Sequence, residues 1–198
     1  MSHEAHPLLL ETIKIEAGHI KNLAYHQKRC DQSRHSLFNV QNSINLSTSI
    51  HPPQEGVYRC RILYTQKIHS IEYLPYLYKE IKRLKIVPSD IDYAHKYANR
   101  EALNHLRISN PNVDEVIIEK GGYLTDTTIS NIAFYDGKRW ITPKTPLLQG
   151  TMRSKLIDEG YLRLEDISKV NLHTYTHVAL MNAMIGFKVI NIDPVQIR

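Results

Sequence analysis

Polar side chains crowd into one short stretch of the sequence, Thr125–Asn131, around a single carboxylate, Asp126. The residues on both sides are apolar and strand-like, and Gly-Gly and Asp-Gly turns bound the segment. A carboxylate between two apolar strands needs a partner, either protein donors or the protonated nitrogen of a ligand. A turn residue that bonds to nearby backbone would need no ligand. The stretch is therefore a candidate binding site, with a structural turn as the alternative.

A lysine, Lys96, lies between a strand-like segment and a helical one in the sequence DYAHKYANRE. A lysine held between two elements can act as a Schiff-base nucleophile if burial lowers the pKa of its amine. A surface lysine at the start of a helix would have the same sequence context. Lys96 is a candidate catalytic residue that needs support from other positions.

Two further segments combine a turn with small or polar residues. Leu147–Lys155 leads through Gly150 into a predicted helix that begins near Thr151. The N-terminus of a helix attracts anions through its N–H groups and its dipole, although an ordinary helix cap explains the segment equally well. Asn182 begins the tight bend NAMIG after an apolar strand, where it can serve a site or only the turn.

Basic side chains occur in two regular patterns. His26 and Arg29 are three residues apart on a predicted helix, where a solvated face is the expected environment. Arg59 and Arg61 alternate on one face of a predicted strand. Such a face is either exposed to solvent or lines an anion pocket.

Other catalytic signatures are missing from the sequence. It contains no GxSxG, GxxxxGK[ST] or GxGxxG motif. Its 11 histidines show neither HExxH nor paired Cys/His spacing, and Cys30 and Cys60 lie outside any CxxC spacing. We therefore expect no metal site and no disulfide framework.

The elements that must position these residues form two groups. The first half predicts a hairpin around Ala17-Gly18, a helix over 26–38, a second hairpin over 56–76, and a helix over 76–87 with a solvated face of Lys79, Lys82, Arg83 and Lys85. After a turn at residues 88–90, the sequence predicts an amphipathic helix over 99–108 with Ala102, Leu103, Leu106 and Ile108 on or near one face, three or more strands over 114–143, a helix over 151–160 and two strands over 176–193. This order argues against a regular βαβ fold and predicts an α/β (α+β) protein with a small α/β domain over 1–88 and a larger β-rich domain over 89–198.

The composition is that of a folded protein. Of the 198 residues, 42% are hydrophobic and 23% are charged. The net charge of +5 comes from positive residues that are scattered along the chain, and a mildly basic surface or small anionic ligands explain it as well as a nucleic acid does. There is no leader-like segment and no apolar stretch of about 18 residues, so we expect a cytoplasmic protein that binds neither nucleic acid nor membrane.

Taken in chain order, the candidate segments resemble the class IV aminotransferase family, the pyridoxal-phosphate (PLP) enzymes of fold type IV. The residues that carry the resemblance are HQKR over 26–29 followed by Ser33, Lys96 with Asn99, GYLTDTTISNIAF over 122–134, LQGTMR over 148–153, and Asn182-Ala183. The resemblance covers nearly the whole chain. It implies a homodimer whose larger C-terminal domain is a β-rich pseudo-barrel, with a small anionic substrate.

The resemblance also implies roles for these residues. Lys96 would form the Schiff base and later carry protons. Asp126, where the family has Glu, would face the pyridine nitrogen. The phosphate would be bound by Arg29, by the amides of Thr151 and Met152, and by Asn182. Asn131 and Leu148 belong to the same cofactor-binding motifs.

Within the family, KYANRE and NAMIG resemble the motifs of aminodeoxychorismate lyases. This likeness implies release of pyruvate from aminodeoxychorismate to give 4-aminobenzoate, a folate precursor. Arg59 and Arg61 would then meet a substrate carboxylate. Two alternatives stay open: an aminotransferase acting on branched-chain or D-amino acids, and a non-catalytic protein on the same fold that binds an anionic metabolite or nucleic acid.

Overall fold

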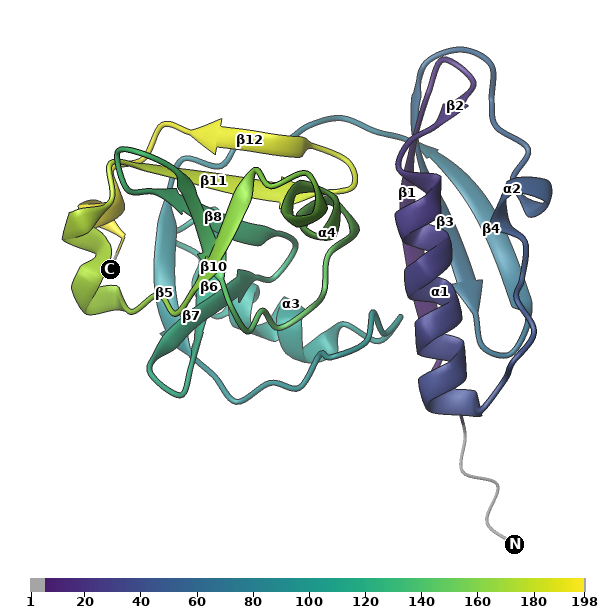
Figure 1. Cartoon of the computed structure of the whole chain (residues 1–198), viewed down its shortest axis with the longest axis horizontal. Coiled ribbons are helices and arrows are strands. Elements are labelled where there is room, and N and C mark those ends of the chain that lie inside the picture. The colour runs from purple at the N-terminus through teal and green to yellow at the C-terminus, as the bar shows by residue number, and fades with distance from the viewer. Residues whose placement is uncertain (1–5, 198) are drawn as a thin grey trace, which may run out of the picture. The chain divides into compact units, whose positions relative to one another are not determined.

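The computed structural model describes residues 6–197, which form two compact units (Figure 1). The first unit contains the described residues up to Leu77 together with His95–Asn99, and the second contains Tyr78–Ala94 and the described residues from Arg100 onward. The chain thus first passes to the second unit after Leu77, and not at residue 88, where the sequence placed the domain boundary. The reason is that the strand at 84–88 pairs with a strand of the second unit.

The first unit is an antiparallel sheet with a long helix on one face. Its elements are β1 (Leu9–Glu16), β2 (His19–Ile20), α1 (Leu23–Phe38), α2 (Leu46–Ser49), β3 (Val57–Tyr64) and β4 (Ile68–Pro75), with strand order β2-β1-β3-β4. Both predicted hairpins and the predicted first helix are confirmed. Ala17 and Gly18 both have positive φ, of 47° and 78°, as a two-residue turn of type I′ requires.

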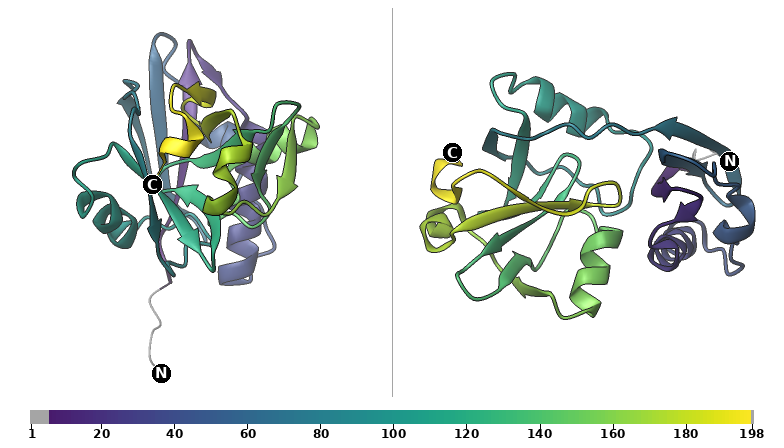
Figure 2. Two further views of the ribbon diagram at one scale, coloured as in Figure 1. Left: turned by 90° about the vertical axis from the view of Figure 1, so that its left-hand side faces the viewer. Right: turned by 90° about the horizontal axis from the view of Figure 1, so that it is seen from above.

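Alternation along the strands gives this sheet one apolar face. Ile13 pairs with Cys60 and Ile15 with Tyr58, and the inward residues form a core with Cys30 and Phe38 of α1. The helix α1 runs along this face of the sheet (Figure 2). Burial of one face of the sheet against α1 fixes the register, because a slip by one residue would turn the apolar side chains outward.

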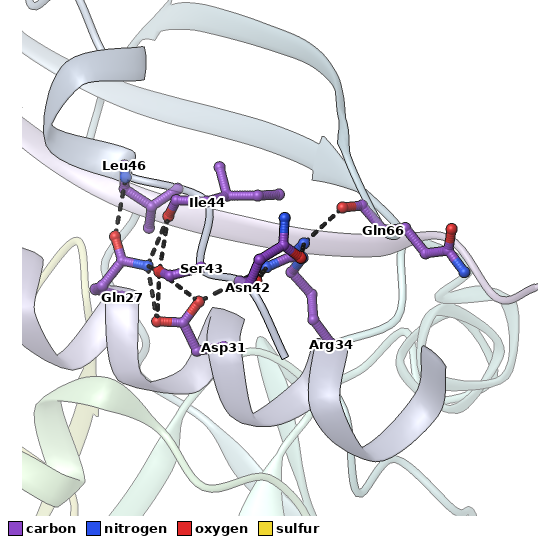
Figure 3. A network of polar contacts seen from close by, with 8 residues as sticks. All are labelled: Gln27, Asp31, Arg34, Asn42, Ser43, Ile44, Leu46 and Gln66. Atoms are coloured by element: carbon purple, nitrogen blue, oxygen red, sulfur yellow. Dashed lines mark hydrogen bonds and ion pairs between the residues drawn. The ribbon is translucent and has the colours of Figure 1, made fainter. Parts of the chain in front are cut away.

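A polar network on α1 joins the helix to the segments around it (Figure 3). Arg34, 1% exposed, donates through Nη2 to the Gln66 carbonyl at 2.7 Å and through Nη1 to the Asn42 carbonyl. Two turns earlier, the Gln27 side chain donates to the Ile44 carbonyl at 2.7 Å and accepts from the Leu46 N–H at 2.9 Å. These contacts fix α1 along its length, because they tie it to both the 39–45 loop and the β3–β4 turn.

The second unit is a branched eight-stranded sheet with two helices. Its elements are β5 (Leu84–Pro88), α3 (Glu101–Ile108), β6 (Glu115–Lys120), β7 (Tyr123–Thr127), β8 (Asn131–Tyr135), β9 (Trp140–Pro143), α4 (Thr151–Asp158), β10 (Leu162–Glu165), β11 (His177–Asn182), β12 (Gly186–Ile190) and the 3-10 turns η1 (Lys169–Thr174) and η2 (Pro194–Gln196). The path β10-β9-β8-β7-β6-β5 carries a branch in which β11 pairs with β8 and β12. The predicted strands over 114–143 and 176–193 and the predicted helix at 151 are confirmed.

The central strands of this unit are buried on both faces, which explains their continuous apolar sequences. In β8, Ile132 and Phe134 face the main core, whereas Ala133 faces a smaller core beneath Leu156 of α4. Strand β11 alternates in the same way. Helices α3 and α4 lie on different sides of the strands (Figure 2).

The expected helix over 76–87 was wrong, whereas the amphipathic helix expected over 99–108 is confirmed as α3. Residues 76–83 form no helix, and 84–88 form strand β5, which pairs in parallel with β6; the basic residues there are exposed but lie on irregular chain or on a strand. In α3, Leu103 is buried but Ile108 is 66% exposed, because the short helix contacts the sheet through a narrow stripe. In the described part of the chain, no helix combines the length and apolar character that crossing a membrane would require.

Candidate active site

In the first unit, the spacing of His26, Arg29 and Ser33 places all three on one face of α1. That face meets Glu11 of β1, which is fully buried in the inward register of Ile13 and Ile15. Arg29 donates from Nε to Oε1 of Glu11 at 2.8 Å and from Nη2 to Oε2 at 2.7 Å. His26 Nδ1 lies 2.6 Å from Oε2 of the same carboxylate. The expectation of a solvated face for His26 and Arg29 was therefore wrong.

The charges in this cluster balance one another. Burial alone would raise the pKa of Glu11, but the Arg29 guanidinium and the His26 ring outweigh it and lower the pKa to about 2. Burial lowers the pKa of His26, and the positive charges of Arg29 and Lys96 lower it further. The Glu11 carboxylate raises the pKa of His26 but does not offset the other effects. Glu11 is thus ionised and His26 neutral at pH 7, so His26 Nδ1 carries the proton that is shared with Glu11.

Lys96 lies in this unit beside the N-terminal part of β1. The Leu10 N–H donates to the Lys96 carbonyl at 2.9 Å, and the Ala98 N–H donates to the Leu8 carbonyl at 2.8 Å. The preceding residue, His95, has its Nδ1 3.3 Å from the Ser33 hydroxyl. The backbone on both sides of Lys96 is thereby fixed. Its side chain is half-buried, and its charge acts on the buried His26 ring.

In the second unit, the Asp126 carboxylate is buried, with 3% of the residue exposed, between β7, β8 and the 144–150 loop. Asn131 Nδ2 donates to its Oδ1 at 2.7 Å, and the Leu148 N–H donates to its Oδ2 at 2.8 Å. Asn131 Nδ2 also donates to the Leu148 carbonyl at 2.8 Å. Both neighbours of Nδ2 are acceptors, which fixes the orientation of the Asn131 amide.

Gly150 allows the Asn131 side chain to pack against the backbone of the 144–150 loop. Its φ of −70° is open to any residue, so conformational freedom is not the reason for a glycine here. A Cβ on Gly150 would instead lie 1.8 Å from Asn131 Oδ1. The glycine of the LQGTMR motif is thus explained by its close contact with Asn131 at the start of β8.

Burial raises the pKa of Asp126 to about 7, against the hydrogen bonds from Leu148 and Asn131 and the positive charge of Arg153. Within the described residues, no lysine, arginine or histidine is in ion-pair contact with Asp126. The site therefore holds a carboxylate in a dry environment, supported by neutral donors. A cation that reached it would favour its ionised form.

The hydroxyl groups around Asp126 hold the turn and not the carboxylate. Thr127 Oγ1 accepts from the Ser130 N–H at 2.9 Å, and Thr128 Oγ1 donates to the buried Glu115 carboxylate at 2.8 Å. Arg100 Nη2 donates to the Thr128 carbonyl at 2.6 Å. Among the side chains of Thr125–Asn131, only Asn131 donates to the Asp126 carboxylate. The sequence analysis missed Glu115 and Arg100, which sit far from the turn in sequence.

Asn182 lies against the same turn. Its Nδ2 donates to the Ser130 hydroxyl at 2.9 Å, and its Oδ1 accepts from the N–H groups of Met184 and Ile185 at 2.9 and 3.0 Å. The Asn182 side chain thus joins the β11–β12 bend to the Thr127–Ser130 turn. Thr151, 4% exposed, and Met152 begin α4 directly after Gly150.

Arg59 and Arg61 lie apart from the other predicted residues of the first unit. Arg59 pairs with Lys14 and Arg61 with Thr12, on the sheet face opposite to Glu11. Arg61 forms an exposed ion pair with Glu72 at 3.1 Å. The structure therefore brings Lys96 and Arg29 together in this unit, and Asp126, Asn131, Leu148 and Asn182 together in the other, but it does not bring the β3 arginines to either group.

Comparisons with known proteins show the family of this chain. Residues 8–191 match the model of the family described as amino-transferase class IV. The chain belongs to the class IV aminotransferase family. A relative from Haemophilus influenzae described as an uncharacterized protein is 36% identical over 187 residues, covering 90% of this chain and 98% of that protein.

Two further members of the family carry more specific names. A "putative aminodeoxychorismate lyase" of Schizosaccharomyces pombe is 31% identical over 126 residues, which cover 59% of this chain and 54% of that protein. The crystal structure of a "putative 4-amino-4-deoxychorismate lyase" from Haemophilus somnus 129PT has 34% identity and a TM-score of 0.83, covering 94% of this chain and 99% of that one. The expected fold type is thereby confirmed.

Each unit of this family member holds residue types that fit a part of PLP, the cofactor of the family. The cofactor combines an aldehyde, a phosphate and a pyridine nitrogen, which call for an amine, cationic or N–H donors, and a carboxylate. The first unit supplies Lys96 and Arg29. The second supplies the start of α4 and a buried carboxylate, Asp126, that has neutral donors on both oxygens but no cation in contact with it.

Glu11 was missed by the sequence analysis, although a signal for it existed. In LLETIKIE the glutamate occupies the same register as Leu9, Ile13 and Ile15, so the alternation that buries these residues also buries Glu11. A carboxylate in that register needs a cationic partner. HQKR on the next helix provides one.

Proposed function

We propose that this protein is a PLP-dependent 4-amino-4-deoxychorismate lyase, which releases pyruvate and forms 4-aminobenzoate. The observation that carries the proposal is the Asp126 carboxylate, buried on neutral donors and suited to a protonated pyridine nitrogen. The names of the relatives from S. pombe and H. somnus support the choice of reaction, as does the likeness of KYANRE and NAMIG to lyase motifs.

We infer the following roles toward the cofactor for the residues that carry the family resemblance. Bound PLP supplies an electron sink for the carbon that loses a proton. Asp126, held by Asn131 and the Leu148 N–H, keeps a positive charge on the pyridine nitrogen. Arg29 and the amides of Thr151 and Met152 bind the phosphate.

Lys96 has two tasks in the proposed reaction. It first anchors the cofactor through Nζ, and it then uses the released amine to take a proton from the ring carbon that bears the substrate amino group. Loss of that proton expels the three-carbon side chain as enolpyruvate and leaves an aromatic ring. Protonation of the enolpyruvate carbon completes pyruvate.

Asn182 has a positioning role in this proposal. Its side-chain amide bonds to Ser130, Met184 and Ile185. In the proposal, Asn182 therefore holds the bend after β11 in place for the phosphate and does not contact the phosphate through its own side chain. We assign no role to Arg59 and Arg61, because they project from the far face of their sheet.

The test is a choice between products. Purified protein with PLP is given 4-amino-4-deoxychorismate, and pyruvate is followed by coupling to lactate dehydrogenase; a second reaction offers branched-chain or D-amino acids with 2-oxoglutarate and measures glutamate. The proposal predicts pyruvate and 4-aminobenzoate in equal amounts, and none from Lys96→Ala. Amino transfer without pyruvate would point to the aminotransferase alternative, and neither product would point to the non-catalytic one.

The homodimer that the family resemblance implies is part of the same proposal. Sedimentation of the PLP-loaded protein is expected to give a particle of twice the mass of the chain. A single-chain particle that is fully active would contradict it.

A further inference from the structure

Arg153, the third residue of α4, is a buried guanidinium that the proposed reaction does not use. It is 2% exposed. Its Nη1 donates to Gln149 Oε1 at 2.8 Å and its Nη2 donates to the Pro143 carbonyl at 2.8 Å, while its Nε is buried without a hydrogen-bond partner. Within the described residues, no carboxylate lies in ion-pair contact with it. Burying a cation without a direct counter-ion costs folding free energy, so we looked for a function of Arg153 at this position.

The two hydrogen bonds of Arg153 hold the loop that contacts Asp126. Pro143 ends β9 where the loop begins, and Gln149 lies at its end, just before α4. Between them, Leu148 gives its N–H to Asp126 and its carbonyl to Asn131. Arg153 therefore braces both ends of the segment that supports the carboxylate.

The charge of Arg153 also acts on Asp126 through the protein interior. Burial raises the pKa of Asp126, and the Arg153 guanidinium opposes this rise; burial lowers the pKa of Arg153, and Asp126 opposes that change in turn. The other groups that act on the carboxylate are uncharged: the Asn131 amide and the N–H groups of Leu147 and Leu148. Water screens such a pair poorly at these depths.

We propose that Arg153 is a positioning residue for Asp126, favouring the ionised form of the carboxyl group from a distance and keeping the loop that bonds to it in place. A direct contact would neutralise the carboxylate and compete with a ligand for its oxygens. A guanidinium set back behind the loop leaves Asp126 available. The consequence for PLP rests on the proposed function, whereas the effect on Asp126 itself does not.

The effect on Asp126 is measured without cofactor, by ¹³C NMR titration of aspartate carboxyl carbons in the full chain. Asp126→Asn identifies the signal. Replacing Arg153 by Met removes the charge and both hydrogen bonds, Arg153→Gln removes the charge but keeps a donor, and Arg153→Lys keeps the charge. Lys155→Met is the matched control, because Lys155 lies on the same helix and pairs with Glu159 at the surface.

The direction of the change separates charge from simple loosening. Loss of the Arg153 charge from an intact, dry site is expected to raise the midpoint of Asp126 titration by about one pH unit or more in the Met and Gln variants, but not in Arg153→Lys or Lys155→Met. Loosening of the loop would admit water and lower the midpoint. A midpoint that falls or stays unchanged in both neutral variants would overturn the proposal. If the Met variant does not fold, Arg153→Gln decides alone.

A second measurement carries the inference to the cofactor. PLP is compared with its deaza analogue, in which a carbon replaces the pyridine nitrogen. Arg153→Gln is expected to bind PLP about tenfold more weakly, the equivalent of one pH unit, with little change for the analogue. Equal loss for both ligands would show a general structural role and contradict the inference. Failure of the wild-type chain to bind PLP would refute the proposed function and leave the NMR result standing.

Discussion

Replacing Gly150 by alanine tests the contact that closes the Asp126 site. The backbone of Gly150, with φ −70° and ψ 141°, suits alanine, so any effect must come from the added methyl group. That Cβ would lie 1.8 Å from Asn131 Oδ1, whereas Cβ contacts shorter than 3.0 Å are essentially never found. Asn131, which is 5% exposed, must therefore move by about 1 Å or more.

The movement costs Asn131 its two hydrogen bonds. The bond from Nδ2 to the Asp126 carboxylate contributes about 1.5–3 kcal/mol as a charge-assisted bond, and the bond to the Leu148 carbonyl contributes about 1 kcal/mol. The expected loss in the free energy of unfolding is about 3 kcal/mol. The midpoint of Asp126 titration should rise at the same time, because the carboxylate loses a donor.

The assay is urea unfolding of four proteins: wild type, Gly150→Ala, Asn131→Ala and the double variant. Once the methyl group of Gly150→Ala has displaced the Asn131 amide, the further change Asn131→Ala should cost little stability. We therefore expect a coupling energy of about 2 kcal/mol between the two substitutions. Lys144→Ala, an exposed position in the same loop, is the control and should change stability by less than about 0.5 kcal/mol. Additive effects, or a Gly150→Ala protein as stable as wild type, would refute the reasoning.

The remaining predictions concern the first unit. Glu11 has its pKa lowered from 4.5 to about 2, so its contribution to stability is complete above pH 4.5 and is lost as the pH falls toward 2. Glu11→Gln should therefore cost about 3 kcal/mol at pH 7 and almost nothing near pH 2, measured by urea unfolding at each pH; an equal cost at both pH values would contradict the ionised Glu11–Arg29 pair. Ala17 has a φ of 47° in a turn that favours Asn-Gly. Ala17→Asn should stabilise the protein by about 0.5–1 kcal/mol and raise Tm by about 2 °C, and a lower Tm would argue against the type I′ turn.

Local patterns in the sequence predicted the elements well where hydrophobic period and turn chemistry agree. The Ala17-Gly18 hairpin, helix α1 and the strands over 114–143 and 176–193 follow from the spacing of apolar residues and from turn residues. The expected helix over 76–87 fails because parallel pairing with β6 outweighs the helical spacing of its charged residues. A tertiary contact of this kind has no local signal.

The sequence names candidate site residues, but it does not predict most of their contacts. The pairing of Asp126 with Asn131 could be anticipated, because the two residues flank one turn. The hydroxyl groups of Thr127 and Thr128 instead satisfy the turn backbone and Glu115. The burial of His26 and Arg29 depends on Glu11 of a neighbouring strand, and the need for glycine at 150 depends on Asn131. Such contacts join residues that are distant in sequence.

The central claim is that Lys96 holds PLP in this chain. The direct measurement is the mass of tryptic peptides after the protein has been incubated with PLP and reduced with borohydride, for the wild type and for Lys96→Ala. We predict a single phosphopyridoxyl group on the peptide that contains Lys96, and no such group at wild-type yield in the variant. A wild-type protein without the modification at Lys96, or an adduct of equal yield in Lys96→Ala, would contradict the claim.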